Sequence, residues 1–445
     1  MKKNEIYEIM ITGVTGEGSG VGRINEMAVF VPYALLGETI RVIIIKVAKS
    51  YAVGKILEVI KPSKNRLKAE CEHFYLCGGC SFWNMTYEEE LLYKQRAVED
   101  CIKRIGKLDA EILPVKGAKN IRHYRNKAQF PVSSDGIGIY AKKSHRVVNI
   151  NSCLIQSQDT ENIVRAVKKW MEEYKVAPYD EKTDSGSVRH IYTRSGKKET
   201  MVVIVTRDEA LKGADRLVEL ITEAEEKVCS IMQNINTKRT NVVLGDKIKL
   251  IWGNEYIVDS IGDKSFKISP FSFYQVNNEQ TKLLYDLAAE FAKVKESDIV
   301  WDLYCGIGTI GQYAAPNAKK VVGIEIVKSA VTNARENAKL NGLKNFEYYC
   351  GLADEMAPEL LKKGLKPDII FLDPPRKGCD TALLDTVAKS GAEKVVYISC
   401  KPSTLARDLL YLTGNGYSIE KIQPLDLFPR TPHVETIVLL QRGTL

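Results

Sequence analysis

Cys400 is the residue whose type and position best suit covalent chemistry. It follows residues 395–399, a β-branched apolar run that is typical of a buried strand. A lone cysteine after a strand is most often a small packing residue. Two neighbours favour a nucleophile instead: Lys401 can lower the thiol pKa, and Pro402 forces the chain out of the sheet. We therefore interpret Cys400 as a candidate nucleophile at the carboxyl end of a strand.

Two other segments are placed to meet Cys400. Residues 373–376 read Asp-Pro-Pro-Arg and end another strand-like run, and residues 428–435 lie near the C-terminus and end at Glu435. In an open parallel sheet, ligands bind in the crevice beyond the strand ends, so the three pieces can converge on one site. From spacing alone, Glu435 fits a general base and a partly exposed strand carboxylate equally well.

A second group of thiols lies nearer the N-terminus. Cys71, Cys77 and Cys80 follow a Cys-x5-Cys-x2-Cys pattern, and two glycines let one tight loop turn them toward a common centre. Four sulfur ligands suit zinc or an iron-sulfur cluster, and the spacing does not choose between them. Cys101 falls in a helical stretch, whereas Cys153 lies in an irregular run. We expect Cys153 to be the fourth ligand.

A glycine-rich loop marks a cofactor site. A strand at 298–302 leads into the loop and then a helix, and a second strand at 321–325 ends in Glu325, where a carboxylate can hold ribose hydroxyls. A nicotinamide dinucleotide and S-adenosylmethionine both fit this pattern. The acid and prolines that follow a later strand at 368–372 favour S-adenosylmethionine, because many methyltransferases place such a wall beside the methyl group. The loop glycines are Gly306, Gly308 and Gly311.

The charge distribution favours a nucleic-acid partner. The net charge of the 445 residues is +8, but residues 116–146 carry eight basic residues against one acid, Asp135. Aromatic residues are interleaved with these charges, a pattern that suits phosphate neutralisation with base stacking. A solvated basic surface is the plainer alternative. The basic residues are Lys116, Lys119, Arg122, Arg125, Lys127, Lys142, Lys143 and Arg146.

Ten cysteines are too few for a disulfide scaffold in a chain of this length. No apolar stretch develops after Met1, and none approaches membrane-spanning length. We expect a cytoplasmic protein with reduced thiols, no membrane contact and no obligate protein partner.

The remaining sequence suggests three domains. Residues 1–62 alternate apolar and polar positions in short runs, as in a small antiparallel barrel, and the segment 16–38 resembles a TRAM domain, an RNA-binding barrel. Residues 63–260 form a central α/β domain with the cysteine loop and the basic segment. Residues 261–445 form a Rossmann-like α/β domain. A helix near 88–106 is a candidate for packing on the last domain.

Four motifs together resemble the RNA (uracil-5-)-methyltransferase family. They begin at Asp302 (DLYCGIGT), Asp373 (DPPRKG), Ser399 (SCKPSTLARDL) and His433 (HVET). The barrel and the four cysteines resemble the 23S ribosomal RNA branch of this family rather than its tRNA branch. One departure is Lys401, where the family more often has Asn. The resemblance therefore does not assign the polar contacts around the pyrimidine.

This resemblance implies a function and a set of site residues. It implies a class I fold that transfers a methyl group from S-adenosylmethionine to C5 of a uridine in 23S rRNA. It assigns Cys400 as nucleophile and Glu435 as base. It assigns Gln275, Tyr304, Glu325 and Asp373 to the cofactor, and a [4Fe-4S] cluster to Cys71, Cys77, Cys80 and Cys153.

Three rival functions remain at this stage. The first is methylation of uridine C5 in tRNA. The second is methylation of an exocyclic amine, since an acid-Pro-Pro wall also serves nitrogen targets but has no need of Cys400. The third is a non-catalytic RNA-binding or ribosome-assembly module. Identifying the methylated atom and measuring transfer of a labelled methyl group to RNA would separate them.

Overall fold

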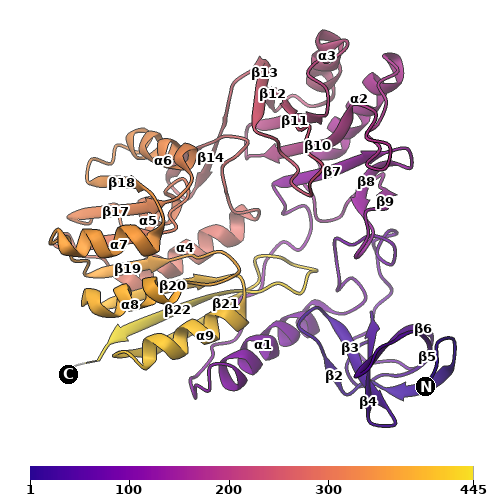
Figure 1. Cartoon of the computed structure of the whole chain (residues 1–445), viewed down its shortest axis with the longest axis horizontal. Coiled ribbons are helices and arrows are strands. Elements are labelled where there is room, and N and C mark those ends of the chain that lie inside the picture. The colour runs from indigo at the N-terminus through magenta and orange to yellow at the C-terminus, as the bar shows by residue number, and fades with distance from the viewer. Residues whose placement is uncertain (444–445) are drawn as a thin grey trace.

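The N-terminal domain is a curved six-stranded sheet in the computed structural model, which describes residues 1–443 (Figure 1). Inward-facing Ile, Val and Ala side chains alternate with outward polar ones and form its core, as the period-two pattern predicts. The spatial order is β1-β5-β6-β4-β3-β2. The strands are β1 (Ile6–Met10), β2 (Gly13–Val14), β3 (Ser19–Ile24), β4 (Met27–Pro32), β5 (Thr39–Val47) and β6 (Tyr51–Lys61).

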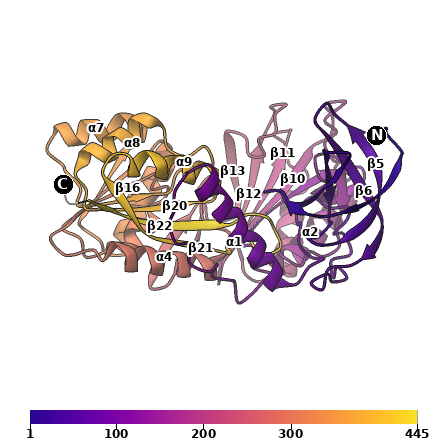
Figure 2. The ribbon, with the colours of Figure 1, turned by 90° about the horizontal axis from the view of Figure 1, so that it is seen from below.

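One long helix, α1 (Tyr87–Arg104), follows the cysteine loop. The side chain of Thr86 caps its N-terminus by accepting a hydrogen bond from the amide of Glu89 at 3.3 Å, and three glutamates occupy its first turn. Val98 and Ile102 are buried in the core of the C-terminal domain. Figure 2 shows α1 lying across the molecule between that domain and the barrel.

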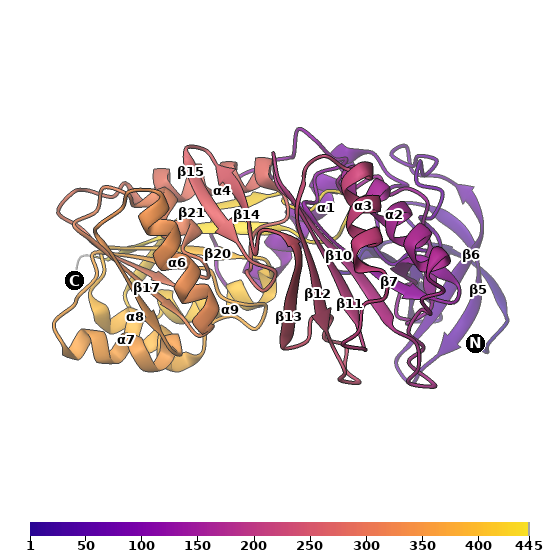
Figure 3. The same cartoon turned by 90° about the horizontal axis from the view of Figure 1, so that it is seen from above.

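The central domain is a seven-stranded sheet with two helices on one face (Figure 3). The sequence pattern of residues 208–231 also predicts one helix. Only α3 forms there, because the apolar run after Lys227 pairs in parallel with β11 and forms β12. Cys229 therefore lies in a strand. The elements are β7 (Lys127–Ser133), β8 (Gly136–Tyr140), β9 (Val147–Asn149), α2 (Asp159–Glu173), β10 (Val188–Ser195), β11 (Thr200–Thr206), α3 (Ala214–Ala224), β12 (Val228–Ile235) and β13 (Lys247–Gly253).

The C-terminal domain contains a second seven-stranded sheet, in the order β18-β17-β16-β19-β20-β22-β21. The first five strands in this order are parallel, and β22 runs antiparallel between β20 and β21. The carboxyl ends of the parallel strands therefore share one edge. The strands are β16 (Ile299–Leu303), β17 (Lys320–Glu325), β18 (Phe346–Cys350), β19 (Ile369–Leu372), β20 (Lys394–Ser399), β21 (Tyr417–Leu425) and β22 (Glu435–Arg442).

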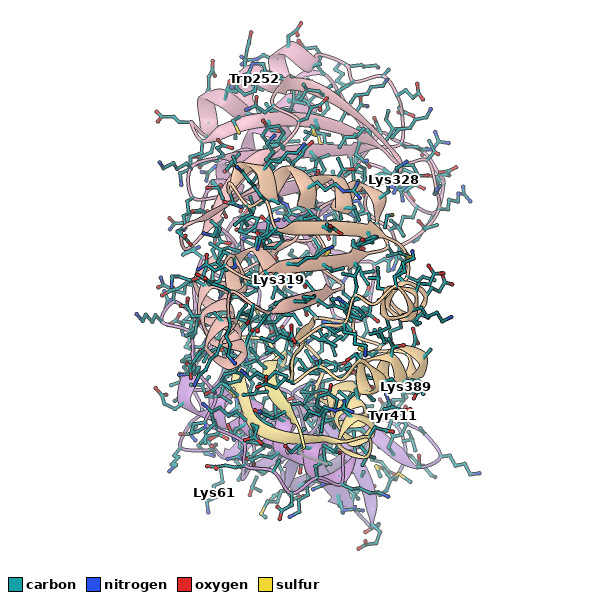
Figure 4. The ribbon with its side chains drawn as sticks, turned by 90° about the vertical axis from the view of Figure 1, so that its left-hand side faces the viewer. Lys61, Trp252, Lys319, Lys328, Lys389 and Tyr411 are labelled. Carbon is teal, nitrogen blue, oxygen red and sulfur yellow. The ribbon has the colours of Figure 1, made fainter. Side chains whose placement is uncertain are left out.

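Helices cover both faces of this sheet (Figures 1 and 4). The carboxyl ends of its parallel strands face the other domains (Figure 1). A hairpin, β14 (Ile257–Ile261) with β15 (Lys264–Ile268), leads into the domain and packs on α6. The helices are α4 (Asn278–Ala292), α5 (Thr309–Ala314), α6 (Lys328–Leu340), α7 (Ala353–Lys362), α8 (Thr381–Ser390) and α9 (Pro402–Thr413). Among residues 1–443 no helix combines the length and apolarity needed to span a membrane.

Candidate active site

Strand register places Cys400 beside Glu435. Cys400 follows β20 directly, and Glu435 is the first residue of β22. Ser399 pairs with Thr436 across these antiparallel strands, so the residues just beyond that pair meet at the sheet edge. Glu435 is only 2% exposed, whereas Cys400 is half-buried and reaches a groove. The two residues that the sequence singled out from separate motifs thus share one site.

Asp373, Arg376 and His433 complete the polar surroundings of the thiol. Asp373 follows β19, the strand next to β20. Nη2 of Arg376 lies 3.4 Å from Nε2 of His433. Arg376, His433 and Cys400 all line the same groove. Arg376 and His433 lay within the motifs recognised in the sequence, but neither was given a role.

Burial governs the charges in this site. It raises the pKa of Glu435 well above its ordinary value, and the nearby Asp373 adds to the rise, while Arg376 opposes it. Burial likewise raises the pKa of Asp373 to about 7. The pKa of the Cys400 thiol rises to about 11, mainly through burial and then through Glu435 and Asp373, and Arg376 again acts in the opposite direction. Arg376 is therefore the group that favours the thiolate.

The glycine loop forms an open cradle at the end of β16. Gly306 has a φ of +56°, and a side chain there would meet no atom within 4 Å, so the loop faces free space. The amide of Gly306 donates to the Glu325 carboxylate at 3.1 Å. The buried Asp302 accepts from Gly311 at 3.0 Å, while its Oδ1 has no partner among the described residues. These features fit a nucleoside-containing cofactor.

The other predicted cofactor residues border this loop or the segment before α4. Tyr304 lies at the start of the loop with a φ of +65°, which turns the chain sharply after β16. Gln275 is 7% exposed, and its carbonyl accepts from Nδ2 of Asn126 at 2.9 Å. This bond ties the central domain to the C-terminal domain.

The four predicted metal-ligating thiols line one small, largely apolar cavity between the cysteine loop and residues 139–156 of the central domain. Aromatic and aliphatic side chains of the same cluster surround them, and burial raises their pKa values, that of Cys77 to about 11. Within residues 1–443 no group of three or more His, Cys, Asp or Glu side chains is arranged to hold a metal ion. The thiols that line the cavity are those of Cys71, Cys77, Cys80 and Cys153.

Buried charges fix the loop that leads to Glu435. Nζ of Lys94, which is 0% exposed, donates to Glu90 at 2.7 Å and to Asp426 at 2.5 Å. The Arg430 guanidinium contacts Glu90 at 3.4 Å and covers the ring of Trp83. Helix α1 and the cysteine loop therefore hold residues 426–434 from one side. Nothing in the sequence pattern of α1 marked Lys94 as a core residue.

A groove of about 800 Å³ runs from Cys400 to the barrel. Its walls are residues 12–17 of the barrel, one side of α1, and the residues around Cys400 and His433. The volume of the groove lies within the range of ligand-binding clefts in proteins.

Comparison with known proteins identifies the relatives of this chain. The family described as tRNA (Uracil-5-)-methyltransferase matches residues 86–443, and the TRAM domain matches residues 2–57. An uncharacterized RNA methyltransferase of Clostridium tetani is 44% identical over 99% of this chain and 97% of its own. One of Halalkalibacterium halodurans is 45% identical over 99% and 98%.

A solved structure resembles the whole chain. The crystal structure of Pyrococcus abyssi tRNA (uracil-54, C5)-methyltransferase in complex with S-adenosyl-L-homocysteine has a TM-score of 0.79 and 27% identity. The match covers 98% of this chain and 100% of that one. The predicted fold class, a TRAM barrel with a C-terminal class I methyltransferase domain, is confirmed. Since a tRNA enzyme shares nearly the full length, overall architecture does not separate the rRNA and tRNA alternatives.

The charges around Cys400 predict how its reactivity responds to mutation. With a thiol pKa of about 11, alkylation by iodoacetamide should speed up about tenfold per unit between about pH 8 and pH 10. The variant Arg376→Gln should shift this profile to higher pH, because a positive charge is lost. Glu435→Gln should shift it to lower pH, because a negative charge is lost. Mass spectrometry of the Cys400 peptide measures both shifts.

The peptide that contains the exposed Cys350 provides an internal control in each sample. Its alkylation rate should be the same in the wild type and both variants. Coincident Cys400 profiles for all three proteins would contradict the electrostatic description of the site.

Proposed function

The chain belongs to the tRNA (uracil-5-)-methyltransferase family, and we propose that it methylates C5 of a uridine in 23S rRNA, giving 5-methyluridine. The observation that carries this proposal is the meeting of the Cys400 thiol and the Glu435 carboxyl at adjacent strand ends. The methyl donor in this family's fold is S-adenosylmethionine, and the glycine cradle at the same sheet edge fits it.

Cys400 supplies the nucleophile in this proposal. C5 of uracil is too weak a nucleophile to attack a methyl sulfonium directly. When the thiolate adds to C6, electron density moves onto C5, which then accepts the methyl group. The Arg376 guanidinium favours the thiolate against the burial that raises its pKa, so we assign Arg376 to activating Cys400.

Glu435 removes the proton that remains on C5 after methylation. Loss of that proton re-forms the C5–C6 double bond and expels the Cys400 thiolate. A buried carboxyl suits this role when ionised, because burial raises its pKa and strengthens it as a base. Asp373 is the second carboxyl in the site and adds to this effect.

The cofactor would be held at the glycine loop. We propose that Glu325 binds the ribose hydroxyls and that Tyr304, Gln275 and Asp373 contact the rest of the molecule. When bound there, S-adenosylmethionine supplies the electrophilic methyl group. Glu325 now accepts from the Gly306 amide, so its carboxylate is already positioned at the rim of the open loop.

RNA would reach the site through the groove. C6 of a paired uridine lies inside the helix stack, so the target base must be unpaired or turned out. The groove that joins Cys400 to the barrel can receive the flanking nucleotides, and the TRAM domain is an RNA-binding barrel.

We propose 23S rRNA as the first candidate substrate on the resemblance of the four-cysteine loop to that branch of the family; the barrel does not bear on the choice, because the architecture is shared with a tRNA enzyme. Uridine C5 in tRNA is the second candidate, and the full-length similarity to the Pyrococcus abyssi tRNA enzyme supports it. An assay with both RNAs decides between them. Methyl transfer from labelled cofactor to an in vitro 23S rRNA transcript, with none to tRNA transcripts, is the expected result. The reverse selectivity would establish the tRNA alternative.

We also propose that Cys71, Cys77, Cys80 and Cys153 hold a [4Fe-4S] cluster. Four soft sulfur donors around one apolar cavity suit iron and sulfide. The cluster would stabilise the loop beside residues 426–434 rather than take part in methyl transfer.

Protein purified without oxygen should be brown and should contain about four iron atoms per chain. Metal analysis and the visible spectrum measure this. Cys153→Ser should lose the colour and the iron. A colourless wild-type protein that contains about one zinc ion per chain would show that the site is a zinc site instead.

The base role of Glu435 predicts a trapped intermediate. Glu435→Gln should methylate the uridine and then retain a covalent protein–RNA adduct, because proton removal fails while the other steps remain. The adduct should be visible as a slowly migrating band on a denaturing gel. Cys400→Ala should form no adduct and no methylated product, which provides the matched control. Intact RNA binding without an adduct in Glu435→Gln would remove Glu435 from the base role.

A further inference from the structure

Two cations face each other directly on the central sheet. Arg194 of β10 pairs with Lys127 of β7 in antiparallel register, so the two side chains project from the same face. Like charges at directly opposed positions repel each other and destabilise a sheet. Arg194 also lowers the pKa of Lys127, although burial is the larger cause of its fall to about 8. The ring of Tyr192 offsets part of this repulsion, since Nζ of Lys127 lies 5.5 Å from its centroid, but within residues 1–443 neither cation forms an ion pair with a carboxylate.

The Arg194 guanidinium has an unused donor. The residue is 1% exposed; its Nε and Nη2 donate to the hydroxyl of Tyr192 at 3.1 and 2.8 Å, and Nη2 also donates to the carbonyl of Ser272 at 2.8 Å. Its Nη1 has no partner among residues 1–443. A buried guanidinium N–H without an acceptor is rare, because it has lost its water without replacement.

Neighbouring acids do not neutralise this pair. Asp259, on the β14–β15 hairpin, accepts hydrogen bonds from Tyr274 and Asn278 instead. Nearby charged groups that act on the pKa of Lys127 are Arg194 and Arg125, both of them positive. Lys127 is partly exposed, so its ammonium group is the one that an incoming anion would meet.

The pair lies at the boundary with the C-terminal domain. Asn126, which precedes Lys127, binds the carbonyl of Gln275, and Arg194 binds the carbonyl of Ser272 in the same segment. Arg125 is close enough to His433 to lower its pKa, and His433 lies beside Arg376 in the groove. Positive side chains thus continue from Arg376 near the thiol through Arg125 to this pair.

We propose that Lys127 and Arg194 form a binding site for a backbone phosphate of the substrate RNA, close to the nucleotide that is methylated. This proposal rests on the proposed function. A row of cations that begins at the nucleophile matches the row of phosphates along an RNA strand. The carboxylate of the cofactor is the competing anion, since Asn126 binds the carbonyl of Gln275, which we assign to the cofactor. The row of cations that leads to Arg376 favours RNA. The site would fix the position of the strand, not read its sequence.

The variant Lys127→Gln tests the site. Its Kd for an in vitro 23S rRNA transcript should rise about tenfold. The slope of log K against the logarithm of the salt concentration should decrease in magnitude by about 1. Its affinity for S-adenosylmethionine should equal that of the wild type. Lys319→Gln is the matched control, because it removes one charge just before β17, at the amino end of the C-terminal parallel strands and away from their carboxyl edge (Figure 4). This control should change neither affinity.

Thermal stability without RNA gives a second readout. Lys127→Gln should melt above the wild type, because one of two opposed cations is removed, and Lys127→Glu should melt higher still, because it supplies a carboxylate to Arg194. Inorganic phosphate at constant ionic strength should raise the melting temperature of the wild type more than that of Lys127→Gln.

Several results would overturn the proposal. RNA binding of Lys127→Gln at wild-type strength would remove the site. Loss of cofactor affinity with RNA binding intact would assign the anion to the cofactor carboxylate. A lower melting temperature together with weaker RNA binding would show that the pair is structural. If the wild type methylates neither 23S rRNA nor tRNA but phosphate still stabilises it through Lys127, the proposed function fails while the anion site stands.

Discussion

The antiparallel pairing of β22 with β20 is the constraint on which the active site depends. The Ser399–Thr436 pair places Cys400 and Glu435 side by side, although the two lie in separate motifs. A shift of one residue would turn Glu435 to the opposite face of the sheet. The register itself is fixed by the apolar side chains of both strands, which are buried between helices on the two faces. The core of the sheet thus positions the catalytic pair.

Burial shifts the pKa values of Cys400 and Glu435. Buried charges also hold the loop before Glu435 in one position. Lys94, Glu90, Asp426 and Arg430 compensate one another in the interior. Removal of one member of such a cluster typically costs about 3–5 kcal/mol, because the remaining charges are left unpaired. The amide of Ser81 also donates to the carbonyl of Arg430 at 2.8 Å, so the cysteine loop is attached to the same segment. Three parts of the chain therefore hold one catalytic loop.

Local patterns in the sequence predicted much of the fold. The strands of the C-terminal sheet ended where apolar runs met Asp373 or Cys400, because buried parallel strands need continuous apolar residues. The barrel followed from alternation. The strand β12 was not predicted, because a short apolar run is compatible with a helix or a strand. Its conformation is decided by its pairing with β11.

Site residues could be predicted from the sequence only where they belong to a recognisable motif. Cys400 and Glu435 were found in this way, and their roles remain predictions. The pairing of Lys127 with Arg194 depends on the register of two strands about 60 residues apart, which no local pattern contains. The burial of Lys94 was missed for a similar reason, since its partner Asp426 is distant in the chain.

Release of the hydrogen from C5 tests the central claim most directly. RNA that carries tritium at C5 of its uridines should lose one tritium to water for each methyl group that it gains. The release should be absent with Cys400→Ala. Methyl transfer without tritium release would place the methyl group on another atom and contradict the proposed roles of both Cys400 and Glu435.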